Sequence, residues 1–210
     1  MSNRALILMI LFSLTLIAGS LYIIHTLDPG AKPKANSEVI STPIPNIIID
    51  DNFTLTTENG TNFTHQNLKE KFTLIYFGFS NCPDICPTIV QKLSEVAKSL
   101  TPNLLEKTQF IFVSIDPQRD DISTLKKFTA EFDHKVLGVT GEAEEINKLT
   151  SSMKVYYSPN NDKNQGDKNY YVDHSSFIYL VNPEVKLIGQ FTSNASSEEI
   201  LDSLKEKMKE

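Results

Sequence analysis

The sequence predicts an α/β domain that follows a single amino-terminal membrane helix. Runs typical of buried strands alternate with runs of helical periodicity, an order that favours helices packed on the faces of one sheet. A charge-free apolar stretch occupies residues 5–24. The only two cysteines, Cys82 and Cys86, lie between a strand-like run and a helix-like run. These features predict a tethered domain whose chemistry centres on a thiol pair.

The amino-terminal stretch has the length of a membrane span. As a helix, residues 5–24 would extend about 30 Å, the thickness of the hydrocarbon core of a bilayer. A cleaved signal peptide is the alternative, because Gly19 and Ser20 are small enough for a cleavage site, but the apolar run continues beyond them. We therefore expect residues 1–24 to form an uncleaved membrane anchor.

The flanking charges bear on the orientation of this anchor. Arg4 precedes it, whereas Lys32 and Lys34 follow it, so counting positive charges alone leaves the topology open. The very short first flank favours a cytoplasmic amino terminus. No Arg-rich and Ser-rich presequence precedes the apolar run. We expect a single-pass protein of a bacterial inner membrane, with its carboxyl-terminal domain in the periplasm.

Residues 25–45 are rich in proline and small polar residues, which is typical of a flexible linker. Residues 46–210 then suit one domain with a proper core. The chain has a net charge of −6 and contains no Lys/Arg-rich stretch, so nucleic acid is excluded as a partner.

The domain is expected to begin with a β-hairpin at the flank of the sheet. Residues 47–49 and 53–55 are strand-like, and residues 62–64 follow a turn. Asn59-Gly60 favours that turn, because both residues accept positive φ angles readily.

The central strand and the following helix enclose the cysteines. Residues 72–77 are apolar on both faces apart from one threonine, as expected for a strand covered by helices on each side. Pro87 suits the first turn of a helix that extends to about Leu100. Cys86 is therefore predicted at the amino end of this helix, and Cys82 in the loop before it.

The remaining elements continue the alternation of strands and helices, with a polar surface insertion at residues 158–169. Strands are predicted at 110–115, 170–172, 176–181 and 186–191, and helices from Asp121 or Ser123 to about Phe132, from Gly141 to about Ser151, and after a cap formed by Ser196 or Ser197 with Glu199.

This order of elements resembles a thioredoxin-like fold with an added amino-terminal β-hairpin. The fold alone does not select an activity. Thiols at a helix amino terminus are favoured as thiolates, which are both nucleophiles and metal ligands. A structural disulfide is the alternative, but a bridge between Cys82 and Cys86 would close so short a loop that it constrains little of the unfolded chain. The spacing therefore favours a reversible or metal-binding role.

His174 is the candidate for a third ligand. It precedes the strand predicted at 176–181, which in a thioredoxin-like topology lies beside the strand that leads to the cysteines. A lone histidine is more often an ordinary polar residue, and it is this inferred position that favours a ligand role. Two thiolates and one imidazole suit Cu(I) or Cu(II), and the lack of an obvious fourth ligand in the sequence argues against a closed structural zinc site.

Three sequence blocks resemble the signature blocks of the Sco/SenC copper chaperones. They are Tyr76-Phe77-Gly78-Phe79 with Cys82-Pro83-Asp84-Ile85-Cys86-Pro87, Val113-Ser114-Ile115-Asp116-Pro117-Gln118-Arg119-Asp120, and Val172-Asp173-His174-Ser175. The resemblance covers about residue 46 to the carboxyl end. It implies a copper site formed by Cys82, Cys86 and His174, and a role in assembling the binuclear copper centre of cytochrome c oxidase subunit II. Other copper chaperones and a thioredoxin-like reductant are further expected partners.

Several acidic residues are candidates for supporting roles around the copper site. Asp173 is a candidate for holding the His174 ring or for contacting a docked partner. Asp84 lies between the two cysteines and is either a second supporting residue or a solvated turn residue. Asp116 and Arg119 are expected to form a structural ion pair, with partner recognition as the alternative.

The resulting hypothesis is a membrane-tethered copper metallochaperone that transfers copper by ligand exchange and is not an enzyme. The alternative is a thiol-disulfide oxidoreductase that uses Cys82 and Cys86 as a redox disulfide and does not need His174. Such oxidoreductases place a cis-proline before the strand that faces the dithiol, whereas Ser176 precedes Phe177 here. The Thr-x-x-Cys motif of peroxidases is absent from the sequence. The missing proline, and a spacing of the cysteines one residue longer than the Cys-x-x-Cys of these oxidoreductases, favour metal binding.

Overall fold

The computed structural model describes residues 11–20, 22, 47–133, 136–158 and 170–209, and it divides the chain into two compact units, Met1–Ser37 and Glu38–Glu210. In the first unit, residues 11–20 and 22 are helical and exposed. No helix within the described residues combines the length and the apolar character that a membrane crossing requires. Much of the expected anchor, and the whole of the expected linker, lie outside the described residues.

The second unit is built on one mixed sheet with the strand order β1-β8-β7-β4-β5-β6-β2-β3. β4 lies inside this sheet and pairs in parallel with β5 and antiparallel with β7, which confirms that the strand after His174 lies beside the strand leading to the cysteines. The strands are β1 (Ile47–Ile48), β2 (Thr54–Thr57), β3 (Asn62–Thr64), β4 (Phe72–Gly78), β5 (Thr108–Ser114), β6 (Val136–Thr140), β7 (Ile178–Val181) and β8 (Lys186–Phe191).

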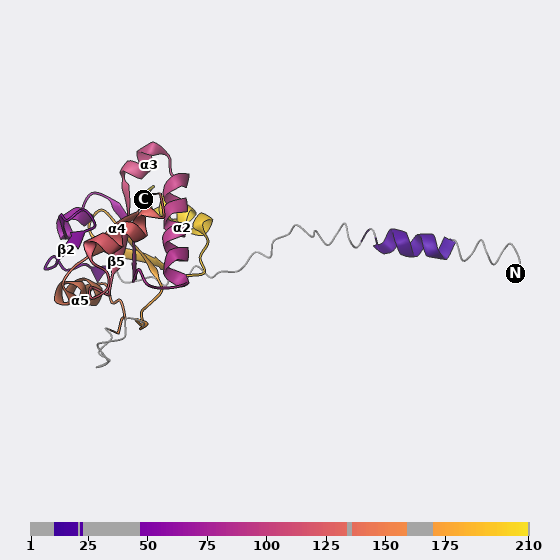
Figure 1. The fold of residues 1–210 in the computed structure, drawn as a ribbon. Coiled ribbons are helices and arrows are strands. Elements are labelled where there is room, and N and C mark those ends of the chain that lie inside the picture. The colour runs from indigo at the N-terminus through magenta and orange to yellow at the C-terminus, as the bar shows by residue number, and fades with distance from the viewer. Residues whose placement is uncertain (1–10, 21, 23–46, 134–135, 159–169, 210) are drawn as a thin grey trace, which may run out of the picture. The chain divides into compact units, whose positions relative to one another are not determined.

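Helices complete the α/β architecture. α2 packs against α6 and against β4 and β5, and Figure 1 shows α2 and α4 in front of the sheet. The predicted caps at Asp121 and Ser196 are confirmed, because their side chains accept the N–H groups of Thr124 and Glu199. The helical segments are η1 (His65–Leu68), α2 (Ile85–Ser99), α3 (Pro102–Glu106), α4 (Ile122–Ala130), α5 (Ala143–Ser152) and α6 (Ser197–Lys207).

The predicted amino-terminal hairpin is only partly correct. β2 and β3 do form an antiparallel pair, and Gly60 supplies the positive φ of +77° in their turn. β1, however, pairs with β8 at the opposite edge of the sheet. Two consecutive isoleucines carry no information about their pairing partner, because register and neighbour depend on the rest of the sheet.

One strand was missed in the sequence, and one predicted strand does not form. The missed strand is β6, which contains Gly138. A Cβ at Gly138 would lie 2.7 Å from Leu125 Cγ and from Glu58 Oε2, which explains the glycine. No strand forms at residues 170–172, where Tyr170–Val172 is irregular. The predicted surface insertion falls at 159–169 outside the described residues.

Candidate metal centre

The two cysteines lie where β4 ends and α2 begins. α2 begins at Ile85, two residues before Pro87, so that Cys86 falls within its first turn. Pro87 is tolerated in this first turn because the first N–H groups of a helix have no intrahelical partner. Cys86 is fully buried and Cys82 is 9% exposed, and both are free thiols. The fold thus presents a dithiol at the edge of its core.

Gly78, the last residue of β4, leaves room for the buried sulfur. A Cβ at this position would lie 2.8 Å from Cys86 Sγ and 3.0 Å from Phe112 Cε2. No real Cβ approaches another heavy atom so closely without displacement of one of them. The glycine therefore allows α2 to pack its first turn directly against the strand.

His174 lies in the segment that precedes β7, outside any regular strand. An isolated antiparallel bridge pairs it with Tyr157, and the N–H of Ser175 donates to the carbonyl of Tyr156 at 2.9 Å. Its Nδ1 lies 2.9 Å from the carbonyl oxygen of Val172. Because a carbonyl oxygen can only accept, Nδ1 carries the proton and Nε2 keeps its lone pair. That tautomer leaves Nε2 available to a metal.

Tyr76 connects the histidine with the dithiol. Its hydroxyl oxygen lies 3.4 Å from Cys86 Sγ and 3.4 Å from His174 Nε2. Burial raises the pKa of the Cys86 thiol to about 12, which contradicts the prediction that the helix terminus favours its thiolate. Burial, reinforced by the charge of Cys86, also raises the pKa of Tyr76 well above its ordinary value. Tyr76 was missed in the sequence, where a tyrosine within an apolar strand is indistinguishable from a core residue.

The donor set matches copper in its chemistry but is not closed. Two sulfurs and one imidazole nitrogen form a soft set that suits copper. Within the described part of the chain, no three His, Cys, Asp or Glu side chains are grouped closely enough to hold a metal ion. The structure brings Cys86 and His174 to a common hydroxyl group, and a three-ligand site requires the imidazole and the sulfurs to come closer together.

The two supporting aspartates are both exposed. Asp84 occupies the N-cap position of α2, but its side chain makes no capping hydrogen bond. Asp173 lies beside His174, and its carbonyl oxygen accepts the N–H of Ser158 at 2.8 Å. The hydrogen bond given for the His174 ring nitrogen Nδ1 goes to Val172 and not to Asp173.

Asp116 and Arg119 form the expected structural ion pair, which confirms that prediction. Their side chains are 4% and 11% exposed, so the pair is buried. Arg119 also donates to the carbonyl oxygen of Tyr170 at 2.8 Å, and the Tyr170 hydroxyl donates to Asp116 at 2.7 Å. The loop after β5 is thereby joined to the start of the His174 segment.

Asp120 fastens the loop that precedes Cys82. Its buried carboxylate accepts the backbone N–H of Ser80 at 2.8 Å and the hydroxyl groups of Ser80 and Ser114. Ser114 is the last residue of β5, so this carboxylate links the cysteine loop to the neighbouring strand. The sequence marks Asp120 only as an acid near the sheet edge, and its three hydrogen-bond donors are visible only in the fold.

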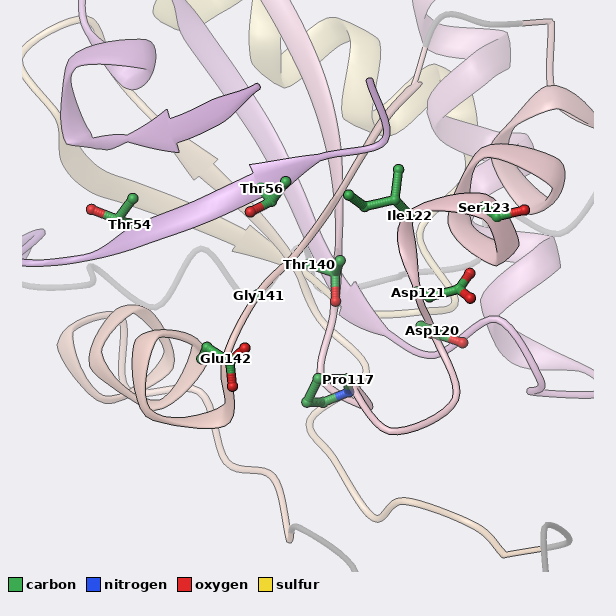
Figure 2. Close-up of a pocket in the computed structure, with 10 residues that line it drawn as sticks. All are labelled: Thr54, Thr56, Pro117, Asp120, Asp121, Ile122, Ser123, Thr140, Gly141 and Glu142. Atoms are coloured by element: carbon green, nitrogen blue, oxygen red, sulfur yellow. The ribbon is translucent and has the colours of Figure 1, made fainter. Parts of the chain in front are cut away.

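A cavity of about 580 Å³ adjoins this carboxylate (Figure 2). None of the ten residues that line it is a cysteine or histidine, so it is distinct from the thiol site. They come from β2, from the loop between β5 and α4, and from the junction of β6 and α5: Thr54, Thr56, Pro117, Asp120, Asp121, Ile122, Ser123, Thr140, Gly141 and Glu142.

Comparison with known proteins relates this fold and site to one family. The SCO1/SenC family model matches residues 42–209. An SCO2-like protein of Rickettsia felis is 35% identical over 205 residues, which cover 98% of each chain. The alignment therefore includes the amino-terminal unit as well as the domain.

Solved structures show the same similarity. Yeast Sco1 with copper bound is 37% identical, with a TM-score of 0.68, over 75% of this chain and 86% of the yeast chain. BsSco, described as having a disulfide switch and as a member of the Sco family of cytochrome c oxidase assembly proteins, is 27% identical, with a TM-score of 0.60, over 77% of this chain and 94% of its own. With the match to residues 42–209, the chain belongs to the SCO1/SenC family.

Proposed function

We propose that this protein is a membrane-tethered copper metallochaperone whose copper ligands are Cys82, Cys86 and His174. The observation that carries the proposal is the convergence of Cys86 Sγ and His174 Nε2 on the Tyr76 hydroxyl, each at 3.4 Å. Two free thiols and an imidazole nitrogen are donors that copper prefers. Copper is the cargo of this site.

The relatives support copper as the metal and cytochrome c oxidase assembly as the process. Yeast Sco1 has been solved with copper bound, and BsSco belongs to a family of cytochrome c oxidase assembly proteins. By transfer from these proteins, the present chain binds copper and takes part in cytochrome c oxidase assembly. In the finer form of the proposal, it delivers copper to the binuclear centre of subunit II.

Delivery would proceed by ligand exchange. Incoming thiolates or imidazoles of the acceptor would replace Cys82, Cys86 and His174 one at a time, so that copper is never released as a free ion. No bond of a substrate is made or broken in such a transfer, and the protein is in this sense not an enzyme. The exposed carboxylates of Asp84 and Asp173 are the candidates for contacts with a partner at this site.

The membrane supplies the second part of the proposal. Residues 5–24 contain no charged side chain and are long enough to anchor the domain in a bacterial inner membrane, with the domain in the periplasm. Other copper chaperones would load the site there, and a thioredoxin-like reductant would keep the dithiol reduced.

Thiol-disulfide exchange is the second candidate function. Two free thiols at the start of a helix, together with the disulfide switch described for BsSco, favour it. In this alternative, the reduced Cys82 and Cys86 pair reduces a disulfide of the oxidase subunit and is itself oxidised to a disulfide, and His174 is dispensable.

Copper titration of the full reduced chain tests the main proposal. We expect the parent to bind one copper ion, the Cys82→Ala/Cys86→Ala variant to bind none, and His174→Ala to lose affinity by at least tenfold. His65→Ala serves as a matched control, because His65 lies in η1, away from the three sequence blocks. If His174→Ala binds Cu(I) and Cu(II) as tightly as the parent, the three-ligand site is wrong. If the parent rapidly reduces disulfides of the oxidase subunit while copper is dispensable for assembly, thiol exchange replaces the main proposal.

A further inference from the structure

The Tyr76 side chain bridges two of the proposed copper ligands. Its hydroxyl oxygen lies at 3.4 Å from both Cys86 Sγ and His174 Nε2. The side chain is fully buried, and its ring packs against Phe112 with a centroid distance of 6.1 Å. β4 and its neighbours therefore hold the hydroxyl in place, and it cannot turn away into solvent.

The hydrogens around this hydroxyl can be assigned one by one. His174 Nδ1 donates to the carbonyl oxygen of Val172, so Nε2 can only accept. The phenol has a single proton to donate, and Nε2 accepts it, whereas Cys86 is a free thiol that can donate its own proton to the phenol oxygen. The hydroxyl of Ser176 also interacts with the phenol. In the metal-free chain, the proton of the phenol therefore goes to Nε2.

Copper would redirect this proton. The change rests on the proposed function, in which Nε2 gives its lone pair to the metal and can no longer accept a hydrogen bond, while Cys86 binds the metal as a thiolate. The thiolate sulfur is then the acceptor within reach of the phenol proton. We propose that Tyr76 is a positioning residue that, in the copper-loaded protein, donates its hydrogen bond to the Cys86 sulfur and thereby favours Cu(I) over Cu(II).

The direction of the effect follows from the chemistry of the sulfur. A hydrogen bond to a thiolate withdraws electron density that the sulfur would otherwise share with the metal. Cu(II) depends on that donation more than Cu(I) does, and hydrogen bonds around a cysteine ligand are known to tune copper potentials. Burial strengthens the effect, because the hydrogen bond lies in a region of low effective dielectric constant.

The Tyr76→Phe variant of the full chain tests this inference. The ratio of the Cu(I) to the Cu(II) association constant is expected to fall roughly tenfold, as befits one hydrogen bond to a charged group. For a one-electron couple, this fold-change lowers the reduction potential by about 59 mV. The sulfur-to-Cu(II) charge-transfer band is expected to move to lower energy, because the sulfur electrons are no longer stabilised by the hydrogen bond.

Tyr179→Phe is the matched control, because Tyr179 is also a buried tyrosine and lies on the neighbouring strand β7. It should leave the affinity ratio and the absorption band unchanged. A second measurement needs no substitution: the Cu–S stretch in the resonance Raman spectrum of the parent should shift in D2O, since the donated hydrogen exchanges.

The outcomes separate this inference from the proposed function. Equal losses of Cu(I) and Cu(II) affinity in Tyr76→Phe, or a parent spectrum that is insensitive to D2O, overturn the hydrogen-bond role while leaving the three-ligand site intact. The ligand set itself is tested separately by copper titration of His174→Ala. If Tyr76→Phe fails to fold, the isotope shift in the parent alone decides.

Discussion

The guanidinium group of Arg119 lies over the ring of Tyr170, with its Cζ 3.6 Å from the ring centroid. The same side chain pairs with Asp116 and lies 5.3 Å from the ring centroid of Phe79. The Phe79 ring in turn meets the ring of His174 at 5.9 Å, edge to face. We call Asp116, Arg119 and Tyr170 the arginine clasp, because it closes the loop after β5 onto the His174 segment.

The arginine clasp should make a large contribution to stability. Arg119→Leu is expected to lower the free energy of unfolding by about 3 kcal/mol, since it leaves the buried carboxylate of Asp116 without its cation. Tyr170→Phe should cost about 1 kcal/mol, because it removes one hydrogen bond to the same carboxylate. Urea unfolding of the full chain measures both values.

The pair of Lys98 and Asp133 is a suitable control for the arginine clasp. Its side chains are 52% and 60% exposed, so Lys98→Ala should cost less than about 1 kcal/mol. Equal losses in Lys98→Ala and Arg119→Leu would contradict the view that burial makes the clasp important.

Gly78 should not tolerate even a methyl group. In Gly78→Ala, the new Cβ would approach Cys86 Sγ to 2.8 Å, which we expect to cost about 1–3 kcal/mol and to weaken copper binding. Gly189→Ala is the control, because a Cβ there meets Leu180 Cβ at an ordinary 3.8 Å. Thermal unfolding and copper titration of both variants check the prediction, which fails if the two substitutions have the same effect.

The carboxylate of Asp120 should control the accessibility of Cys82. Asp120→Asn replaces one of the two oxygens that accept hydrogen bonds from Ser80 and Ser114 with an NH2 group, which can only donate. We expect it to cost about 2 kcal/mol and to accelerate alkylation of Cys82 by iodoacetamide. Cys86 should remain slow, because it is fully buried and its pKa is raised to about 12. Mass spectrometry of the alkylated peptides distinguishes the two sites.

Asp121→Asn is the matched control for this experiment. Asp121 is the neighbouring residue and caps α4, a role that asparagine performs equally well. Unchanged alkylation in Asp120→Asn, or equal acceleration in both variants, would refute a specific role of Asp120 in holding the cysteine loop.

Alkaline pH should destabilise the protein partly through Tyr179. Burial raises the pKa of this phenol to about 12, whereas in the unfolded chain it is about 10. The contribution of the protonated Tyr179 phenol to the free energy of unfolding is therefore complete below pH 10. It is lost as the pH rises toward 12, because in that range only the unfolded chain releases the proton. The loss is up to about 1.4 kcal/mol per pH unit.

The Tyr179→Phe variant should remove this part of the pH dependence. Denaturant unfolding of the copper-free chain at pH 8 and at pH 11 gives the change in the free energy of unfolding for parent and variant. If this free energy falls more between the two pH values in the variant than in the parent, the sign of the effect is wrong.

The pattern of apolar residues predicted much of the sheet. β8 matches its expected range, Lys186–Phe191, and β4 is one residue longer than expected, because residues 72–77 are apolar on both faces as in any central strand. The proximity of Cys86 and His174 was predictable for the same reason, since it depends on β7 lying beside β4.

Other parts of the site depend on contacts that local sequence does not encode. The role of Tyr76 arises from two residues that reach it from α2 and from the segment before β7. The hydrogen bonds that Asp120 receives from Ser80 likewise span 40 residues of chain. Such polar contacts produce no regular pattern in the sequence, whereas the burial of a whole strand produces a recognisable run of apolar residues.

The Cys86 thiol and the His174 imidazole, two of the proposed copper ligands, differ in how firmly the fold holds them in place. Cys86 is fixed in the first turn of a core helix, whereas His174 lies in an irregular segment that is held by one isolated bridge, a few backbone hydrogen bonds and the arginine clasp. Irregular segments of this kind open at lower free energy than core helices do. Handover would therefore have a built-in order: the imidazole yields first, and the sulfurs retain the metal until an acceptor is in place.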